Sequence, residues 1–216
     1  MYEDLILLSN LISPFVVGME GNISKKTEDG LIIKASGSKL KNITQNDFVL
    51  YDYYGNQLNN LEKKGSMELS FHTYLLESYN FKYVCHSHPT NLLKILISDK
   101  LTDFAHNRYF PDQVVFNGKK SCIVPYGKPG VNLTNNIKES LTEFIKNEGF
   151  FPKIILLENH GLIVCGNSID ECVITTEICE KSAEIFTSPF KKNPLSPVEI
   201  EDLINDQNEQ YRIKKL

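Results

Sequence analysis

The sequence lacks a strong excess of charge of either sign, because its 23 basic and 27 acidic side chains give a formal net charge of −4. This balance gives no support to nucleic acid or an anionic membrane as the main partner. No apolar run is long enough to cross a bilayer. The segment Met1-Tyr2-Glu3-Asp4 is acidic where a secretory signal is basic. We therefore expect no membrane partner and a cytoplasmic location.

Paired cysteines, repeats and linkers are missing as well. The five cysteines are an odd number, and no two of them form a Cys-x-x-Cys pair. This excludes the usual pattern of a disulfide framework or a cysteine zinc site and favours reduced thiols. No low-complexity tract or linker divides the 216 residues, and hydrophobic residues make up 41% of them. The length and composition predict one globular domain over residues 1–216.

Helical and strand-like patterns alternate along the chain. Apolar spacing and capping residues predict helices near residues 4–13, 66–78, from 90, 133–147, 168–186 and from 196 toward 211. Short apolar runs predict strands at 31–34, 48–54, 83–88, 113–116, 121–126, 154–157 and 162–165, whereas 18–24 is rich in turn residues. Several connections are too short for a parallel crossover. The sequence therefore predicts a single α/β domain with a central, largely antiparallel sheet flanked by helices.

Two histidines at the end of one predicted strand give the first functional signal. Side chains two residues apart on a strand lie on the same face, so His86 and His88 present both imidazoles to one space. Pro89 ends the strand at that point. Two imidazoles on one face can bind a divalent metal, although a strand end can also carry two histidines without that role.

A third histidine lies in a predicted turn. His160 stands between the strands 154–157 and 162–165, next to Gly161. A histidine in a turn often does no more than bond to the backbone. With His86 and His88, however, it would complete a three-histidine site, and three protein ligands leave a coordination position open as in a catalytic zinc centre. A metal with an open position can bind a carbonyl or hydroxyl oxygen of a substrate.

Glu68 lies at the start of a predicted helix, where the helix dipole favours a carboxylate without any functional reason. The alternative is a general acid and base beside the metal. His72 follows one turn later on the same helix face, where it could contact Glu68 or be an ordinary helix histidine. The glycine-containing loops 21–24 and 36–39, with Ser66 at a helix N-terminus, could together hold an anion, although ordinary turns use the same residues.

In their order along the chain, these segments resemble the class II aldolase/adducin family. The motifs are Gly21-Asn22-Ile23-Ser24, Ser36-Gly37, Ser66-x-Glu68, His86-x-His88-Pro89, Val124-Pro125-Tyr126, Asn159-His160-Gly161 and Glu180-x-x-Ala183. The resemblance covers a core of about residues 5–187, and a C-terminal helix is expected at about 197–210. It implies a compact α/β fold with a central antiparallel sheet.

The resemblance also implies a metal-dependent aldolase that cleaves or forms a C–C bond in a ketose, expected to be a sugar phosphate, through an enediolate. Zn²⁺, or another divalent metal such as Mn²⁺ or Co²⁺, would be held by His86, His88 and His160. Glu68 would be the acid and base. The phosphate end of the substrate would face Asn22, Ser36, Gly37 and Ser66, and Lys39 would tune its binding.

Members of this family are commonly homotetramers with active sites between subunits, in which a neighbour's tyrosine protonates the leaving aldehyde. Tyr109 and Tyr211 are the candidates by position, and both could also be ordinary surface tyrosines. Met67 stands where phosphate-binding aldolases usually have a second hydroxyl residue, so the sugar and its phosphorylation stay open. The alternatives are a sugar-phosphate 4-epimerase, a decarboxylase, a dehydratase, or an adducin-like assembly module that would lack the metal ligands.

Overall fold

Seven strands form one sheet in the order β3-β2-β1-β4-β7-β6-β5 in a computed structural model that describes residues 1–59 and 61–215. Residues 60 and 216, which the predicted 1–216 domain includes, lie outside the described residues. All neighbouring strands are antiparallel except β5 and β6. This confirms the predicted α/β domain with a largely antiparallel sheet. The strands are β1 (Asn22–Lys26), β2 (Gly30–Lys34), β3 (Phe48–Asp52), β4 (Tyr83–Ser87), β5 (Cys122–Val124), β6 (Ile154–Leu157) and β7 (Gly161–Gly166).

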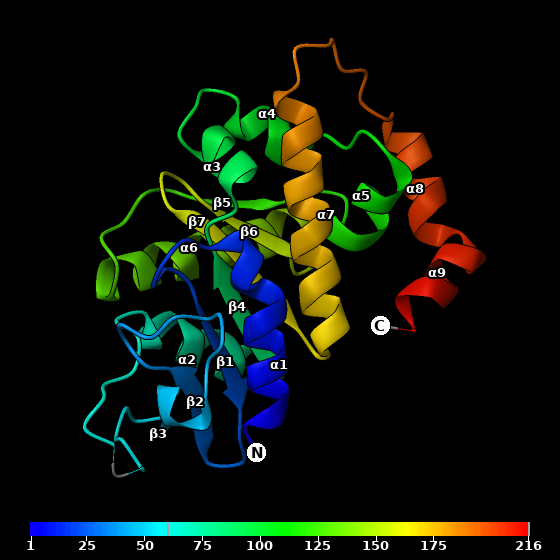
Figure 1. Ribbon diagram of the computed structural model, residues 1–216. Helices are drawn as coiled ribbons and strands as arrows, with labels where there is room; N and C mark the ends of the chain where they lie inside the picture. The colour runs from blue at the N-terminus through cyan, green and yellow to red at the C-terminus, as the bar shows by residue number, and fades with distance from the viewer. Residues whose placement is uncertain (60, 216) are drawn as a thin grey trace.

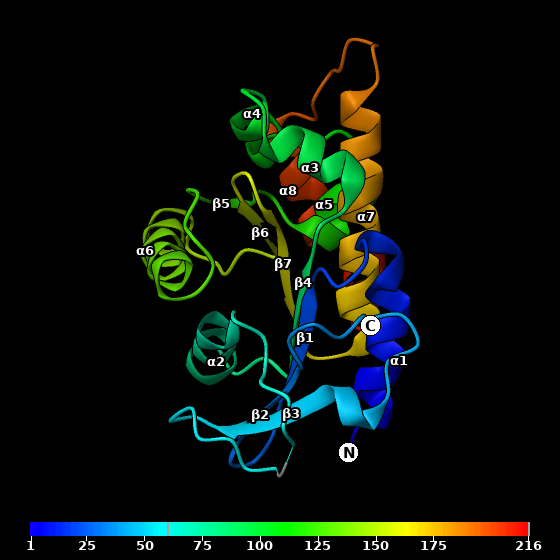
Figure 2. The same ribbon diagram turned by 60° about the vertical axis from the view of Figure 1, so that its left-hand side comes forward.

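Helices cover both faces of the sheet (Figures 1 and 2). On one face lie α2 (Leu69–Ser78) and α6 (Val131–Glu148), and on the other lie α1 (Glu3–Ile12) and α7 (Ile169–Thr187). Alternation along β2 builds both cores, because Leu31 packs on the α2 face and Ile32 on the α1 face. The remaining helices are α3 (Thr90–Leu96), α4 (Leu101–His106), α5 (Pro111–Asn117), α8 (Pro197–Asn205), α9 (Gln207–Ile213) and the short 3₁₀ helices Ser13–Phe15 and Gln45–Asp47.

Three local predictions were wrong. Residues 113–116 belong to helix α5, because Pro111 starts a helix at its first position and the apolar side chains that follow pack toward α7. The turn-rich segment 18–24 contains the start of strand β1, whose polar residues concealed it. The last helix is broken at Asp206, whose side chain caps α9 by accepting bonds from the N–H groups of Asn208 and Glu209.

Candidate metal centre

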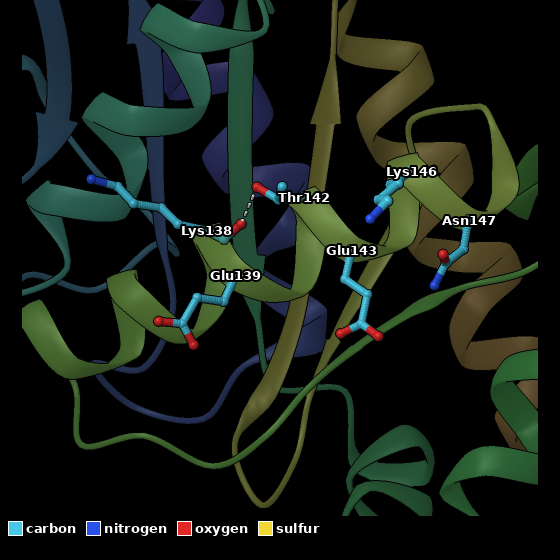
Figure 3. A pocket seen from close by; sticks show the side chains of 6 residues that line it. All are labelled: Lys138, Glu139, Thr142, Glu143, Lys146 and Asn147. Atoms are coloured by element: carbon cyan, nitrogen blue, oxygen red, sulfur yellow. Dashed lines mark hydrogen bonds between the residues drawn. The ribbon is translucent and has the colours of Figure 1, made fainter.

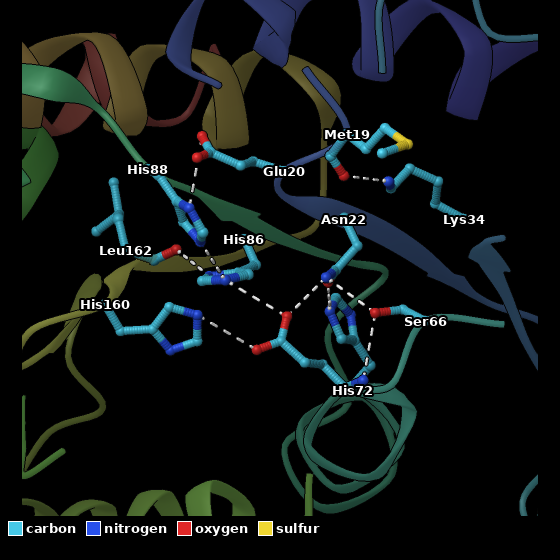
Figure 4. A network of polar contacts seen from close by, with 11 residues as sticks. Met19, Glu20, Asn22, Lys34, Ser66, His72, His86, His88, His160 and Leu162 are labelled. Atoms are coloured by element: carbon cyan, nitrogen blue, oxygen red, sulfur yellow. Dashed lines mark hydrogen bonds and ion pairs between the residues drawn. The ribbon is translucent and has the colours of Figure 1, made fainter. Parts of the chain in front are cut away.

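The sheet places three histidines at one of its ends. His86 lies on β4 in register with Asn22 of β1 and Ile163 of β7, and His88 follows just beyond the strand. His160 lies in the β6–β7 turn, which Asn159 closes with a left-handed φ of 55°. Potential ligand atoms of the three histidines all lie within 4.8 Å of one another. The structure therefore brings together the three histidines that the sequence predicted (Figure 4).

A glycine allows this convergence. A Cβ atom at Gly161 would lie 2.6 Å from Cδ2 of His88 and 2.6 Å from the Ser87 carbonyl oxygen. Both distances are shorter than a side-chain carbon tolerates, so only glycine lets β7 start beside the two histidines of β4. The Asn159-His160-Gly161 motif thus has a steric reason as well as a chemical one.

The hydrogen bonds of His86 select its tautomer. Its Nδ1 lies 3.0 Å from the Leu162 carbonyl oxygen, which can only accept, so Nδ1 carries the hydrogen and Nε2 keeps its lone pair toward the cluster. His88 has Nε2 3.0 Å from Nε2 of His86, and its Nδ1 lies 3.6 Å from the Glu20 carboxylate. Burial, followed by the neighbouring histidine, lowers the pKa of His86 to about 3 and of His88 to about 4. Both rings are neutral at pH 7, the form that binds metals.

Glu68 completes the cluster. Its Oε2 lies 3.4 Å from Nε2 of His86, and its Oε1 lies 3.5 Å from Nε2 of His160. Glu68 Oε1 and His160 Nδ1 are buried without a hydrogen-bond partner. Buried polar atoms without partners are rare in proteins and call for an explanation such as an ion. The orphaned carboxylate oxygen and the neutral imidazoles fit a divalent cation held by His86, His88 and His160.

Polar residues of β1 and the segment before α2 hold the other side of Glu68. Asn22 donates through Nδ2 to Glu68 Oε2 at 2.7 Å and to Ser66 Oγ at 3.0 Å. Ser66 Oγ also accepts from the backbone N–H of Glu68 at 3.2 Å. The His72 ring, which the sequence analysis considered as a possible contact of Glu68, is linked to the Glu68 carboxylate through Asn22. Asn22 and Ser66 therefore lie beside the carboxylate.

An open pocket of about 200 Å³ leads to this cluster. Most of the predicted binding residues line it, together with residues that the sequence analysis did not select. The predicted ones are Gly21, Asn22, Ser36, Gly37, Ser66, Glu68, His88 and His160; the others are Met19, Lys34, Met67 and Pro129.

Lys34 is the main residue that sequence reasoning missed. It is only 2% exposed, and its Nζ donates to the carbonyl oxygens of Met19 at 3.0 Å and Ser38 at 2.5 Å. Burial lowers the pKa of Lys34 to about 8, while the carboxylates of Asp47 and Glu68 act to raise it. The available signal was a lone charge at the end of the apolar run Leu31-Ile32-Ile33, two residues before the Ser36-Gly37 loop.

Three other candidates lie away from the pocket of this chain. Lys39 is exposed and does not line the pocket, although its loop does. Tyr109 packs against Phe186 with ring centroids 5.7 Å apart, and Tyr211 is 63% exposed on α9. A role for either tyrosine in the site of a neighbouring subunit stays a prediction.

A larger hollow of about 550 Å³ lies along the outer face of α6 (Figure 3). Its six lining residues all come from this one helix, and neighbouring lysine and glutamate side chains there are typical of a solvated helix surface. No groups from different elements converge on it, so the smaller pocket above the histidines is the candidate site.

Within the described residues, no helix has the length and apolar character needed to span a membrane.

Comparisons with known proteins identify the family of this chain. Residues 13–187 match the family model described as Class II Aldolase and Adducin N-terminal domain. The chain is 27% identical to 3-oxo-tetronate 4-phosphate decarboxylase of Haemophilus influenzae, over 88% of this chain and 89% of that protein. It is 26% identical to L-fuculose phosphate aldolase of Methanococcus maripaludis, over 79% of this chain and 86% of that protein.

The crystal structure of YgbL from Escherichia coli shares the fold, with a TM-score of 0.76 at 24% identity over 92% of this chain and 96% of that chain. The family match covers far more than half of the sequence and includes every residue of the three-histidine cluster and Glu68. The chain belongs to the class II aldolase and adducin family.

Proposed function

We propose that this protein is a metal-dependent aldolase that breaks or forms a C–C bond in a small ketose phosphate. The observation that carries the proposal is the convergence of three imidazoles and the Glu68 carboxylate at the base of an open pocket. An adducin-like assembly module would have no need of this arrangement. The presence of all four groups therefore favours an enzyme.

A divalent ion on His86, His88 and His160 would polarise a substrate oxygen and stabilise the negative charge of an enediolate. In the cleavage direction, a base removes the proton of the hydroxyl next to the scissile bond, the C–C bond breaks, and its electron pair enters the enediolate. Glu68, which lines the pocket beside the histidines, returns a proton to the reacting carbon. Lys34, Ser36 and Gly37 lie along the pocket wall, where they can hold a phosphate group.

Decarboxylation is a second candidate, favoured by the similarity to the Haemophilus influenzae decarboxylase over 88% of this chain. Loss of CO₂ from a 3-oxo acid that carries a 2-hydroxyl group also leaves the electron pair of the broken bond in an enediolate. The same residues would therefore serve both reactions. What differs is the leaving group, since release of an aldehyde needs a base that accepts the proton of its hydroxyl group and release of CO₂ does not.

The ion, the assembly and the location belong to the same proposal. Three imidazoles beside a carboxylate suit Zn²⁺, and Mn²⁺ or Co²⁺ can replace it. We expect a cytoplasmic homotetramer in which Tyr109 or Tyr211 of one subunit reaches the pocket of another.

The test combines metal analysis with a substrate screen. Purified protein should contain about one divalent ion per chain, which His88→Ala should lose while His106→Ala, a change of an exposed histidine, should not. Short ketose phosphates are screened for aldehyde release, and 3-oxo acid phosphates for CO₂. Glu68→Gln should lower kcat by about a hundredfold to ten-thousandfold with the metal retained, whereas the exposed Glu139→Gln should not.

Full activity in protein stripped of metal, or full activity of Glu68→Gln, would contradict the mechanism. Protein that never retains a divalent ion and converts no substrate of either class would favour the assembly module instead. Release of CO₂ without release of aldehyde would replace the first candidate by the second.

A further inference from the structure

A buried hydrogen-bonded chain runs from the sheet to Glu68, and Figure 4 shows Asn22 and His72 within it. Asn22 and Ser24 lie two residues apart on β1, so both side chains face α2, where they meet the two ring nitrogens of His72. His72 is fully buried, with Nδ1 2.6 Å from Ser24 Oγ and Nε2 hydrogen-bonded to Asn22 Oδ1. The amide nitrogen of Asn22 continues the chain to Glu68 Oε2 at 2.7 Å.

The donors of this chain all point in one direction. The Asn22 carbonyl oxygen can only accept, so the hydrogen of the neutral His72 ring is on Nε2. Nδ1 then has only a lone pair, so the Ser24 hydroxyl donates to it. The Asn22 amide donates onward to Glu68 and Ser66. Each member of the chain therefore fixes the orientation of the next.

The orientation of Asn22 depends on this arrangement. The two ends of an amide have nearly the same shape but opposite hydrogen-bonding character. If Asn22 were turned over, its carbonyl oxygen would face the Glu68 carboxylate, and two acceptors would repel each other. With its hydrogen on Nε2, His72 adds to this preference, because the N–H requires an acceptor at its end of the amide.

We propose that His72 is a positioning residue: through Asn22 it holds Glu68 Oε2 as a hydrogen-bond acceptor and leaves Oε1 as the oxygen that exchanges protons with substrate. The two carboxylate oxygens differ accordingly, since Oε2 has the Asn22 donor and Oε1 has no hydrogen-bond partner. The assignment of Oε1 rests on the proposed function. The arrangement of His72, Asn22 and Glu68 does not.

The experiment compares two variants that carry the same amide group on side chains of different length. In His72→Gln the amide nitrogen can approach the position of Nε2 and donate to Asn22. In His72→Asn the shorter amide can approach only the position of Nδ1, beside Ser24. Both variants should unfold within a few degrees of the parent. In the metal-free parent, long-range ¹⁵N NMR of His72 should show the tautomer protonated at Nε2.

The side-chain amide resonances of Asn22 should keep their parental shifts in His72→Gln and move in His72→Asn. With a substrate identified by the screen, His72→Asn should lower kcat by about a hundredfold through misplacement of Glu68. KM should change by only a few-fold, and His72→Gln should restore most of kcat. Should either variant fail to fold, Ser24→Ala removes the donor to Nδ1 and should move the Asn22 resonances in the same direction.

A His72 ring protonated at Nδ1 would overturn the proposal. So would equal Asn22 resonances and equal kcat in His72→Gln and His72→Asn, because the residue would then only fill space. The NMR measurements need neither metal nor substrate. A failed substrate screen would therefore contradict the proposed function, whereas the NMR measurements would still test the arrangement of His72, Asn22 and Glu68.

Discussion

Two buried cationic side chains in this protein, those of Lys34 and Arg108, differ in how their hydrogen-bond donors are used. Lys34 is 2% exposed and Arg108 is 1% exposed, and both donate hydrogen bonds to backbone carbonyl groups. Lys34 has two such acceptors, so one of its three N–H groups is left beside an open pocket. All three nitrogens of Arg108 donate instead, to the carbonyl groups of Phe104, Ala105, Asn107 and Gly118 and the hydroxyl of Ser121.

The difference separates a binding group from a structural one. Arg108 ties the end of α4 to the segments around α5, because each of its three side-chain nitrogens donates to a group of the protein. Lys34 has a donor to spare and a pKa of about 8, and it lines the same pocket as Glu68. The same contrast holds for acceptors, because Glu68 Oε1 in the pocket has no partner. Hydrogen-bond donors and acceptors that have no partner and face a pocket, rather than burial itself, mark the site.

Arg108→Met should have the largest effect on stability. The change leaves several buried carbonyl groups without a donor, each at a cost of about 1–3 kcal/mol, partly offset because the buried charge is gone. We expect the free energy of unfolding to fall by about 3 kcal/mol, measured by chemical denaturation. Metal content per folded chain should not change. An unfolding curve equal to that of the parent would show that Arg108 does not organise this region.

Lys34→Met should affect phosphate binding rather than stability. The free energy of unfolding should change little, because removal of a desolvated charge offsets the donor lost to the carbonyl groups of Met19 and Ser38. Affinity for inorganic phosphate in the presence of a chelator should fall by about tenfold to a hundredfold, since a hydrogen bond to a charged group contributes about 1.5–3 kcal/mol. Isothermal titration calorimetry measures this loss. Unchanged phosphate binding would place the anion elsewhere in the pocket.

The pH dependence of phosphate binding sharpens the comparison. Because the pKa of Lys34 is about 8 in the free protein, its charge is present below pH 8 and is lost as the pH rises through that value. Affinity for phosphate should therefore fall above pH 8, by at most about tenfold per pH unit. Lys34→Met should show no such fall. A parental affinity that stays constant from pH 7 to pH 10 would contradict a role for the Lys34 charge.

The stability of the free protein should respond to pH in the opposite sense. The unfolded chain binds more protons at Lys34 between pH 8 and the ordinary lysine pKa of 10.5. The contribution of Lys34 to stability therefore rises with pH through this window. The difference in unfolding free energy between the parent and Lys34→Met, measured at both ends of the window, tests this sign.

The ligand histidines were predictable because strand periodicity is local. His86 and His88 share a face whatever the rest of the sheet does, and His160 needed only a turn between two apolar runs. Glu68 followed from the motif order. The burial of Lys34 was not predictable in this way, because it depends on the strand pairing that places β2 next to β1 and on the loops that cover its end.

The same limit explains why strand β1 and the chain through His72 were missed. Asn22 and Ser24 look like loop residues until β1 is placed between β2 and β4, where they become buried partners of His72. Glu20 approaches His88 for the same tertiary reason. Polar residues inside a sheet can be recognised as strand residues only when the element that supplies their hydrogen-bond partners is known.

Lys39→Ala should give the smallest effect and completes the comparison with Lys34. Lys39 is exposed on the loop that carries Ser36 and Gly37, so its charge acts on the pocket through solvent. We expect a loss of phosphate affinity smaller than that of Lys34→Met. The loss should vanish at about 1 M salt, where charges are screened over about 3 Å, while the Lys34→Met loss should largely persist. A salt-resistant loss in Lys39→Ala as large as that of Lys34→Met would mean that the exposed lysine contacts the anion directly.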